Sequence, residues 1–166
     1  MRADEDHRVD AFFAGRGIDM EAHRAVFELI RTASLVVGVM EEQALRPLGL
    51  SHAGYRLLCE LWIKGPLEPR DLAAFMMVTR PSIVGAVDTL EADGLVARTR
   101  STTDRRMTTV ALTAAGRELV ERADAAWHEW QVRVTSGLSP AEKRQLAKLD
   151  RRLGNTALEL RARVLA

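Results

Sequence analysis

The sequence holds a single cysteine, Cys59, so no disulfide can form within the chain. A lone cysteine is typical of proteins from a reducing compartment. Cys59 lies in the apolar stretch 55–62, where a free cysteine usually packs as a small hydrophobic side chain. A redox-sensing thiolate would instead need exposure and a nearby cation. Arg56 is three residues away, so this second interpretation stays open.

Long apolar runs are also absent. The most apolar run, residues 35–40, is six residues long, whereas a membrane-spanning helix needs roughly 20 residues. The chain begins MRADED, which is acidic and lacks the apolar core of a signal peptide. We therefore expect a cytoplasmic protein with no membrane partner.

The residue patterns of common enzyme and metal sites are missing from the sequence too. None of the four histidines (His7, His23, His52 and His128) stands at a zinc-site spacing from a second ligand. The sequence has no glycine-rich phosphate loop, no GxSxG motif and no readable Cys–His pairing. We expect no enzyme, no metal and no cofactor.

Lysine is scarce, because 21 of the 24 basic residues are arginine, although the formal net charge is only +1. An arginine bias suits recognition of phosphates and bases by the guanidinium fork, but the codons of a GC-rich genome are the simpler explanation. The local charge is more informative. Residues 94–106 carry four arginines and one acid, which indicates a cationic surface for a polyanion.

The spacing of apolar and capping residues predicts a mainly helical chain. We expect helices at about 20–45, 52–64, 69–75, 80–92, 113–135 and 140–163. Two short segments, 95–100 and 107–112, favour strands and predict a β-hairpin with a cationic tip. The N-terminal residues 1–18 are expected to form a short helix or a loose arm, and residues 19–166 a single domain.

The fold class that follows is mainly α with a small β-hairpin wing (α+β). Two short helices, a tight turn and a hairpin, at about 51–112, are the order of a winged helix-turn-helix. Its second helix fits the major groove, and the wing can place an arginine in the minor groove. Long helices at about 20–46 and 113–163 carry apolar stripes without a partner in the chain, so we expect them to dimerise.

Three sequence motifs carry a family resemblance. They are LEADGLV at 90–96, DRR at 104–106 and LTAAG at 112–116. Together, at these spacings, they resemble the MarR family (multiple antibiotic resistance regulators) over roughly residues 24–160. The resemblance implies a homodimer with two winged lobes on a palindromic double-stranded DNA operator, in the cytoplasm on the nucleoid. It also implies release of the DNA by a small phenolic or aromatic ligand.

The same resemblance implies the roles of individual residues. Asp104 would brace the wing and hold Arg105 and Arg106 toward the minor groove, since charge-assisted pairs are strong. The sequence departs from the family where Val84 and Gly85 stand in place of a frequent Thr-Arg, so base reading should rest on Arg80 and Ser82. The candidate DNA-binding residues are Thr79, Arg80, Pro81, Ser82, Gly85, Thr89, Arg98, Arg100, Asp104, Arg105 and Arg106.

An apolar effector pocket is expected above the DNA-binding lobe, although ordinary core is the simpler explanation for each residue. Its candidate residues are Phe27, Arg31, His52, Arg56, Trp62 and Met76. Trp127 and Trp130 are expected at the dimer interface. The leading hypothesis is a ligand-released repressor. The alternative is a winged-helix dimer that binds DNA or protein without an effector, and the sequence does not decide between repression and activation.

Overall fold

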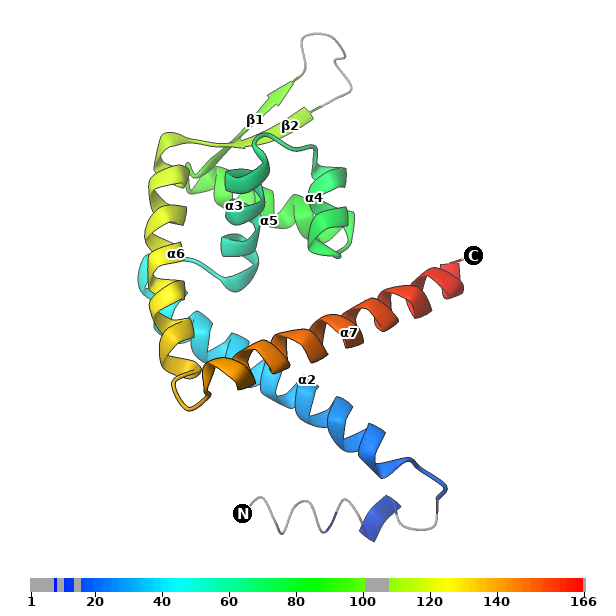
Figure 1. Cartoon of the computed structure of the whole chain (residues 1–166). Coiled ribbons are helices and arrows are strands. Elements are labelled where there is room, and N and C mark those ends of the chain that lie inside the picture. The colour runs from blue at the N-terminus through cyan, green and yellow to red at the C-terminus, as the bar shows by residue number, and fades with distance from the viewer. Residues whose placement is uncertain (1–7, 9–10, 14–15, 101–107, 166) are drawn as a thin grey trace.

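The computed structural model describes residues 8, 11–13, 16–100 and 108–165. Within them the chain is mainly helical with one antiparallel hairpin (Figure 1), as predicted. The elements in chain order are α2 (Met20–Met40), η1 (Glu41–Leu45), η2 (Arg46–Leu48), α3 (His52–Lys64), α4 (Pro69–Met76), α5 (Arg80–Ala92), β1 (Val96–Arg100), β2 (Thr108–Leu112), α6 (Ala114–Val134) and α7 (Pro140–Leu165).

The helix starts follow from capping side chains. The side chains of Asp19, Ser51, Thr79 and Thr113 each accept a hydrogen bond from a backbone N–H in the first turn of α2, α3, α5 and α6. These bonds satisfy donors that the helix itself leaves unpaired. Ser139 forms the predicted capping box with Glu142, because its N–H donates to Glu142 Oε2 at 2.8 Å and its hydroxyl accepts from the Glu142 N–H at 3.4 Å. The Ser139 hydroxyl, which donates to the same carboxylate at 2.6 Å, and then the Ser139 N–H hold the Glu142 pKa below its usual range.

The first long helix does not run unbroken to residue 45 as the sequence predicted. It ends at Met40 and continues as the π-helical turn η1 and the short 3-10 helix η2. In η1, Glu41 accepts a hydrogen bond from the His52 backbone N–H at 2.9 Å. The widened turn is thus tied to the first residue of α3, and π-turns often occur at functional sites.

The buried core belongs to the lobe of α3, α4, α5 and the hairpin, together with η1 and α6. The hairpin pairs Val96 with Leu112 and Arg100 with Thr108. Leu67, from the loop before α4, adds a short bridge to Val110 through hydrogen bonds of 2.8 and 3.0 Å. Because Val110 is fully buried, this bridge fixes the base of the wing against the helices.

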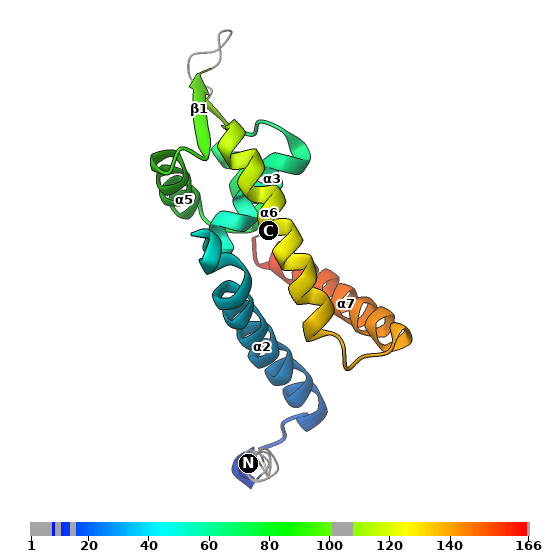
Figure 2. The same cartoon turned by 90° about the vertical axis from the view of Figure 1, so that its left-hand side faces the viewer.

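Helix α6 leaves the hairpin and runs along α3, and α2 extends away from the lobe (Figures 1 and 2). Helix α7 begins at the far end of α6 and diverges from α2 toward the C-terminus (Figure 1). The Tyr55 hydroxyl donates to Asp124 Oδ1 at 3.1 Å and links α3 to α6. Trp130 of α6 is only 5% exposed. The expectation that Trp130 lies at a dimer interface is therefore wrong, because the indole packs in the chain's own core.

Candidate nucleic-acid interface

Helix α5 is held in place by one apolar face. Ile83, Val87 and Leu90 are all buried, at the spacing that puts them on one side of a helix. Thr79 caps the helix, and Pro81 occupies the first turn, where its missing N–H is not needed. The opposite side of α5 is therefore presented to solvent in a fixed orientation.

The predicted recognition residues lie on that exposed side. Thr79, Arg80, Pro81, Ser82, Gly85 and Thr89 are all exposed. The Ser82 hydroxyl shares a 2.8 Å hydrogen bond with the Thr79 hydroxyl, and the Thr89 hydroxyl donates to the Gly85 carbonyl at 3.1 Å. The structure thus brings these side chains together along one helix surface of a size that fits the major groove.

The turn between α4 and α5 is made by a strained residue. Met77 has φ 56° and ψ 37°, in the left-handed region, although it is not glycine. This conformation ends α4 and turns the chain toward the start of α5. Left-handed backbone is unfavourable for a residue with a Cβ atom, so the tight turn of the helix-turn-helix is maintained by the packing of the two helices.

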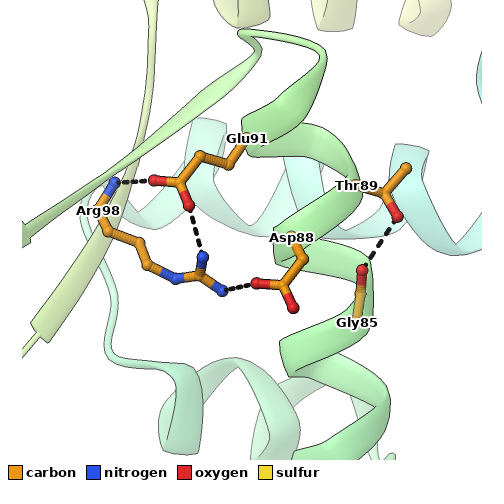
Figure 3. A network of polar contacts seen from close by, with 5 residues as sticks. All are labelled: Gly85, Asp88, Thr89, Glu91 and Arg98. Carbon is orange, nitrogen blue, oxygen red and sulfur yellow. Dashed lines mark hydrogen bonds and ion pairs between the residues drawn. The ribbon is translucent and has the colours of Figure 1, made fainter.

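Arg98 of β1 does not point away from the lobe, as a DNA contact would require, but toward α5. Figure 3 shows its guanidinium between two carboxylates, at 2.5 Å from Asp88 Oδ1 and 2.5 Å from Glu91 Oε2. Its backbone N–H also donates to Glu91 Oε1 at 3.1 Å. The hydrogen bond to Asp88 is the main reason that the pKa of Arg98 is raised. This network joins the wing to α5 and neutralises two acids on the solvent side of the helix.

Sequence reasoning missed this network, although a signal was present. Asp88 and Glu91 are three residues apart, so they lie on one face of a helix, and Arg98 follows on the next element. What the pattern did not contain is the angle at which β1 crosses α5. That angle is set by tertiary packing, which places Arg98 beside both carboxylates.

The wing itself is described only at its base. Arg100 ends β1, paired with Thr108. Asp104, Arg105 and Arg106, which the sequence places at the wing tip, lie outside the described residues.

The structure explains why the family motifs contain glycine and threonine at these positions. Gly94 follows α5 with φ 72°, a left-handed conformation that favours glycine. The Thr113 hydroxyl donates to the Gly94 carbonyl at 2.7 Å and accepts from the Gly116 N–H at 3.0 Å. A Cβ atom at Gly116 would lie 1.9 Å from the Leu95 carbonyl oxygen. The two glycines and the threonine therefore fix how α6 leaves the wing.

Three of the predicted effector residues are brought together behind the recognition helix. Arg56 Nη2 donates to the Met76 carbonyl oxygen at 3.3 Å, and Met76 is buried. His52 is close enough to Arg56 to feel its charge. Burial first, and then the Arg56 charge, hold the pKa of His52 below its usual range. A neutral imidazole beside a guanidinium could hydrogen-bond an anionic ligand.

The other three predicted effector residues are apart from this group. Phe27 and Arg31 are exposed on α2, where Phe27 stacks on His23 and Arg31 pairs with Glu28 at 3.1 Å. Trp62 is half-buried against the core near the end of α3. Within one chain, α2 leads away from the lobe (Figure 1), so Phe27 and Arg31 do not join Arg56 there.

Cys59 has the surroundings of a packed thiol. It is half-buried and lies against Tyr55. Burial is the main cause that raises the pKa of the Cys59 thiol, and burial also raises the pKa of Tyr55. A raised pKa keeps the thiol protonated and unreactive, which argues against the redox-sensing alternative.

Comparison with known proteins assigns the family. The family model described as MarR family matches residues 50–108. A MarR-family transcriptional regulator from Rhodococcus sp. RHA1 is 30% identical, with a TM-score of 0.71, over 80% of this chain and 93% of that one. The chain belongs to the MarR family. It is thus a transcriptional regulator built on a DNA-binding winged helix, and curated relatives also include HTH-type transcriptional regulators.

Two further MarR-like structures have ligands associated with them. CouR from Rhodococcus jostii RHA1, solved with p-coumaroyl-CoA, is 32% identical over 78% of this chain and 90% of CouR, with a TM-score of 0.68. BpsR of Bordetella bronchiseptica is 27% identical over 78% of this chain and 98% of BpsR, with a TM-score of 0.70. Its DNA binding is regulated by 6-hydroxynicotinic acid.

Two searches of the described residues gave no further site. No three His, Cys, Asp or Glu side chains cluster there in a way that could hold a metal ion. None of the described helices is long and apolar enough to cross a membrane.

Proposed function

We propose that this MarR-family regulator is a homodimeric repressor that binds a palindromic operator and is released by a small aromatic ligand. The observation that carries the proposal is the division of the exposed surface. One lobe presents a rigid recognition helix with polar side chains on its exposed side, and the terminal helices present apolar faces that none of the described residues covers. Such a protein would act on the nucleoid, with residues 19–166 as one domain and 1–18 as an arm.

The exposed side of α5 is the proposed reader of the operator. Arg80 is the only cation between residues 79 and 92, so a bidentate arginine–guanine pair from this helix would have to come from it. Ser82, Thr79, Pro81, Gly85 and Thr89 share that surface. The wing residues Arg100, Asp104, Arg105 and Arg106 are proposed to supply the minor-groove and phosphate contacts.

Arg98 takes a different role in the proposal from the DNA contact expected from sequence. Its guanidinium already has two carboxylate partners on α5. We assign it to holding β1 against the recognition helix and to neutralising Asp88 and Glu91. Without that compensation, two carboxylates would face the phosphates of the operator.

The dimer is supported by the apolar faces of α2 and α7. Every described side chain of α7 through residue 163 is exposed, including Leu146, Leu149, Leu153 and Leu160. A groove of about 440 Å³ lies between the two helices, and its apolar lining includes Val26, Leu29 and Leu153. A second copy related by a two-fold axis would fill such a groove with its own helices, and obligate interfaces bury about 2,000 Å² or more.

The effector site is proposed at His52, Arg56 and Met76, behind the recognition helix. Phe27 and Arg31 would complete it from α2 of the second copy. An aromatic acid fits this set because Arg56 and His52 can bind a carboxylate while Phe27 of the second copy covers a ring. The aromatic ligands of BpsR and CouR support this class of effector.

The test uses the purified full chain and the DNA upstream of its own gene. Light scattering is expected to give a dimer at micromolar concentration, and gel shift to give binding to a palindrome there. A panel of hydroxylated aromatic acids is then titrated into the complex. One member is expected to release the DNA from wild type but not from an Arg56→Ala variant. A stable monomer, or a dimer that binds no palindrome, contradicts the proposal.

The recognition helix is tested against the wing with two variants. Arg80→Ala should weaken binding to the operator more than binding to scrambled DNA, since a base contact discriminates by about 1–3 kcal/mol. Arg106→Ala should weaken both and lower the salt dependence, because phosphate contacts are sequence-independent. Equal losses for both DNAs in Arg80→Ala would make Arg80 a phosphate contact.

One observation favours the second candidate function, a winged-helix regulator without an effector. The Arg56 guanidinium is already bound to the Met76 carbonyl, and Arg31 is paired with Glu28. A regulator in which both cations only brace the protein would keep its operator in the presence of every aromatic acid. The ligand panel described above separates the two functions.

A further inference from the structure

The exposed side of the recognition helix contains an apolar position that the proposed function leaves unused. Val84 is 46% exposed, although its neighbour Ile83 on the core side is 1% exposed. An exposed valine in a helix is not favoured by helix propensity. Val84 is of interest because it lies on the exposed side of the recognition helix, where the proposed operator would bind.

Three of the four exposed hydrogen-bonding side chains of α5 are already engaged. The exposed hydrogen-bonding side chains of α5 are those of Arg80, Ser82, Asp88 and Thr89. Ser82 is bonded to Thr79, Thr89 to the Gly85 carbonyl, and Asp88 to Arg98 (Figure 3). One turn of α5 beyond Val84, the Asp88 carboxylate is thus neutralised. What the middle of the helix offers to a base edge is mainly the isopropyl group of Val84.

Gly85 lets this short side chain reach a base. Valine extends little beyond the backbone, so it contacts a base only if the helix lies deep in the groove. A Cβ atom built at Gly85 meets nothing within 4 Å, and the residue is exposed. The absence of a side chain beside Val84 allows that close approach.

We propose that Val84 reads the 5-methyl group of a thymine in each half of the operator. The thymine methyl is the apolar feature of the major groove, and apolar side chains recognise it by contact. This inference rests on the proposed DNA binding by α5 and adds the specificity of one position. Val84 would thus read a base by apolar contact, whereas Arg80 would read one by hydrogen bonds.

The test removes the methyl group from the DNA and the isopropyl group from the protein. A preferred duplex is first selected from random sequences with the full-length protein. Each thymine is then replaced, one symmetric pair at a time, by deoxyuridine, which differs only by the missing methyl. Affinities are measured by fluorescence anisotropy at one salt concentration for wild type, Val84→Ala and Val84→Thr. Val78→Ala, an exposed valine in the preceding turn, is the matched control.

Replacement of one symmetric pair of thymines is expected to lower the affinity of the wild-type protein. This replacement should weaken wild-type binding about three- to tenfold per half-site, and Val84→Ala should weaken binding to the thymine duplex by a similar factor. Val84→Ala should no longer respond to deoxyuridine at that pair, whereas Val84→Thr, which keeps one methyl, and Val78→Ala should still respond.

The outcomes separate this inference from the proposed function. If wild type responds to no replacement, or if Val84→Ala responds as strongly as wild type, Val84 does not read a methyl group, and DNA binding by α5 stands. If no duplex is enriched and none binds, the proposed function fails, and the role of Val84 fails with it.

Discussion

The winged lobe buries its apolar side chains within the chain, whereas the terminal helices leave theirs exposed. Every buried hydrophobic side chain of the described residues lies between Met40 and Trp130. Helix α2 before Met40 and the whole of α7 contribute none, yet they expose Val26, Leu35 and several leucines. Exposed contiguous apolar surface in a soluble protein marks an interaction site. The lobe therefore folds on contacts within the chain, and we expect the terminal helices to be covered by contacts from outside it.

The two regions also differ in how tightly their residues are packed. In the lobe the packing leaves no room for one added atom, as at Gly116, where no Cβ atom fits. In α7 the apolar residues recur with helical spacing, but no described residue packs tightly against them. Mutations should accordingly act on stability in the lobe and on assembly in the helices.

The largest effect on stability is expected from Gly116→Ala. Its Cβ atom would lie 1.9 Å from the Leu95 carbonyl oxygen, so either α6 or the segment between α5 and β1 must shift. Overpacking of this kind against backbone should destabilise the protein by about 3 kcal/mol or more. Urea denaturation followed by circular dichroism measures the loss.

Gly38→Ala is the matched control on the terminal helices. Gly38 is an exposed residue of α2, and its Cβ atom would meet nothing within 4 Å. Because alanine has a higher helix propensity than glycine, this variant should be more stable than wild type by about 0.5–1 kcal/mol. If the two variants have the same effect, the lobe is not the tightly specified region that the structure indicates.

The next effect tests the terminal helices. Leu153→Glu puts a carboxylate into the apolar groove between α2 and α7, where burying an unpaired charge is unfavourable. Light scattering should show the loss of the dimer, while the thermal transition of the lobe stays. Affinity for a two-site operator should fall about a hundredfold or more, because two linked sites bind more tightly than one.

Asn155→Glu provides the control for this variant. Asn155 is two residues away, on the other side of α7, so the same charge is added outside the groove. It should leave the assembly unchanged. If both variants remain dimeric, the groove is not where the second copy packs.

The contrast between the two regions also explains what could be predicted from sequence. Within the lobe, caps such as Ser51 and Thr79, and the left-handed Gly94, mark local boundaries, and local signals located the helices correctly. The π turn at η1 escaped prediction, because it arises where Glu41 meets His52 from the next helix. Such a contact depends on tertiary packing rather than on a local pattern.

The candidate site could be predicted only in part for the same reason. The exposed start of α5 followed from the helical period, since Ile83, Val87 and Leu90 had to face the core. The partners of Arg98 did not follow, because the crossing of β1 over α5 decides them. Trp130 was placed at an interface because an aromatic residue on a long helix suits either a core or a partner. Only the fold distinguishes the two.

A smaller effect is expected from Arg98→Ala, which separates the wing from the recognition helix. Asp88 and Glu91 would then face the operator phosphates without a counter-charge. Operator affinity should fall about five- to thirtyfold, equivalent to ~1–2 kcal/mol, through like-charge repulsion. Stability should change by only about 0.5–1 kcal/mol, because the Asp88 side chain is 59% exposed and solvent screens the pair.

The double variant Arg98→Ala, Asp88→Asn decides how Arg98 acts. If Arg98 neutralises Asp88, removing that acid should restore most of the lost affinity. If Arg98 instead contacts a phosphate, the double variant should bind as weakly as Arg98→Ala. Anisotropy titrations at one salt concentration distinguish these results.

The smallest effect is expected at the turn of the helix-turn-helix, where a substitution should increase the stability of the protein. Met77 adopts φ 56° and is 58% exposed, so little packing is lost when its side chain is removed. Glycine accepts left-handed backbone without a Cβ clash, and Met77→Gly should stabilise by about 0.5–1 kcal/mol after its larger entropy in the unfolded chain is counted. For a chain of this size, that raises the thermal midpoint by roughly 1–4 °C. Met77→Ala removes the same side chain but keeps a Cβ atom, so it should show no gain. If Met77→Ala stabilises as much as Met77→Gly, the exposed methionine rather than the backbone is the unfavourable element. The turn would then be as unstrained as the rest of the lobe.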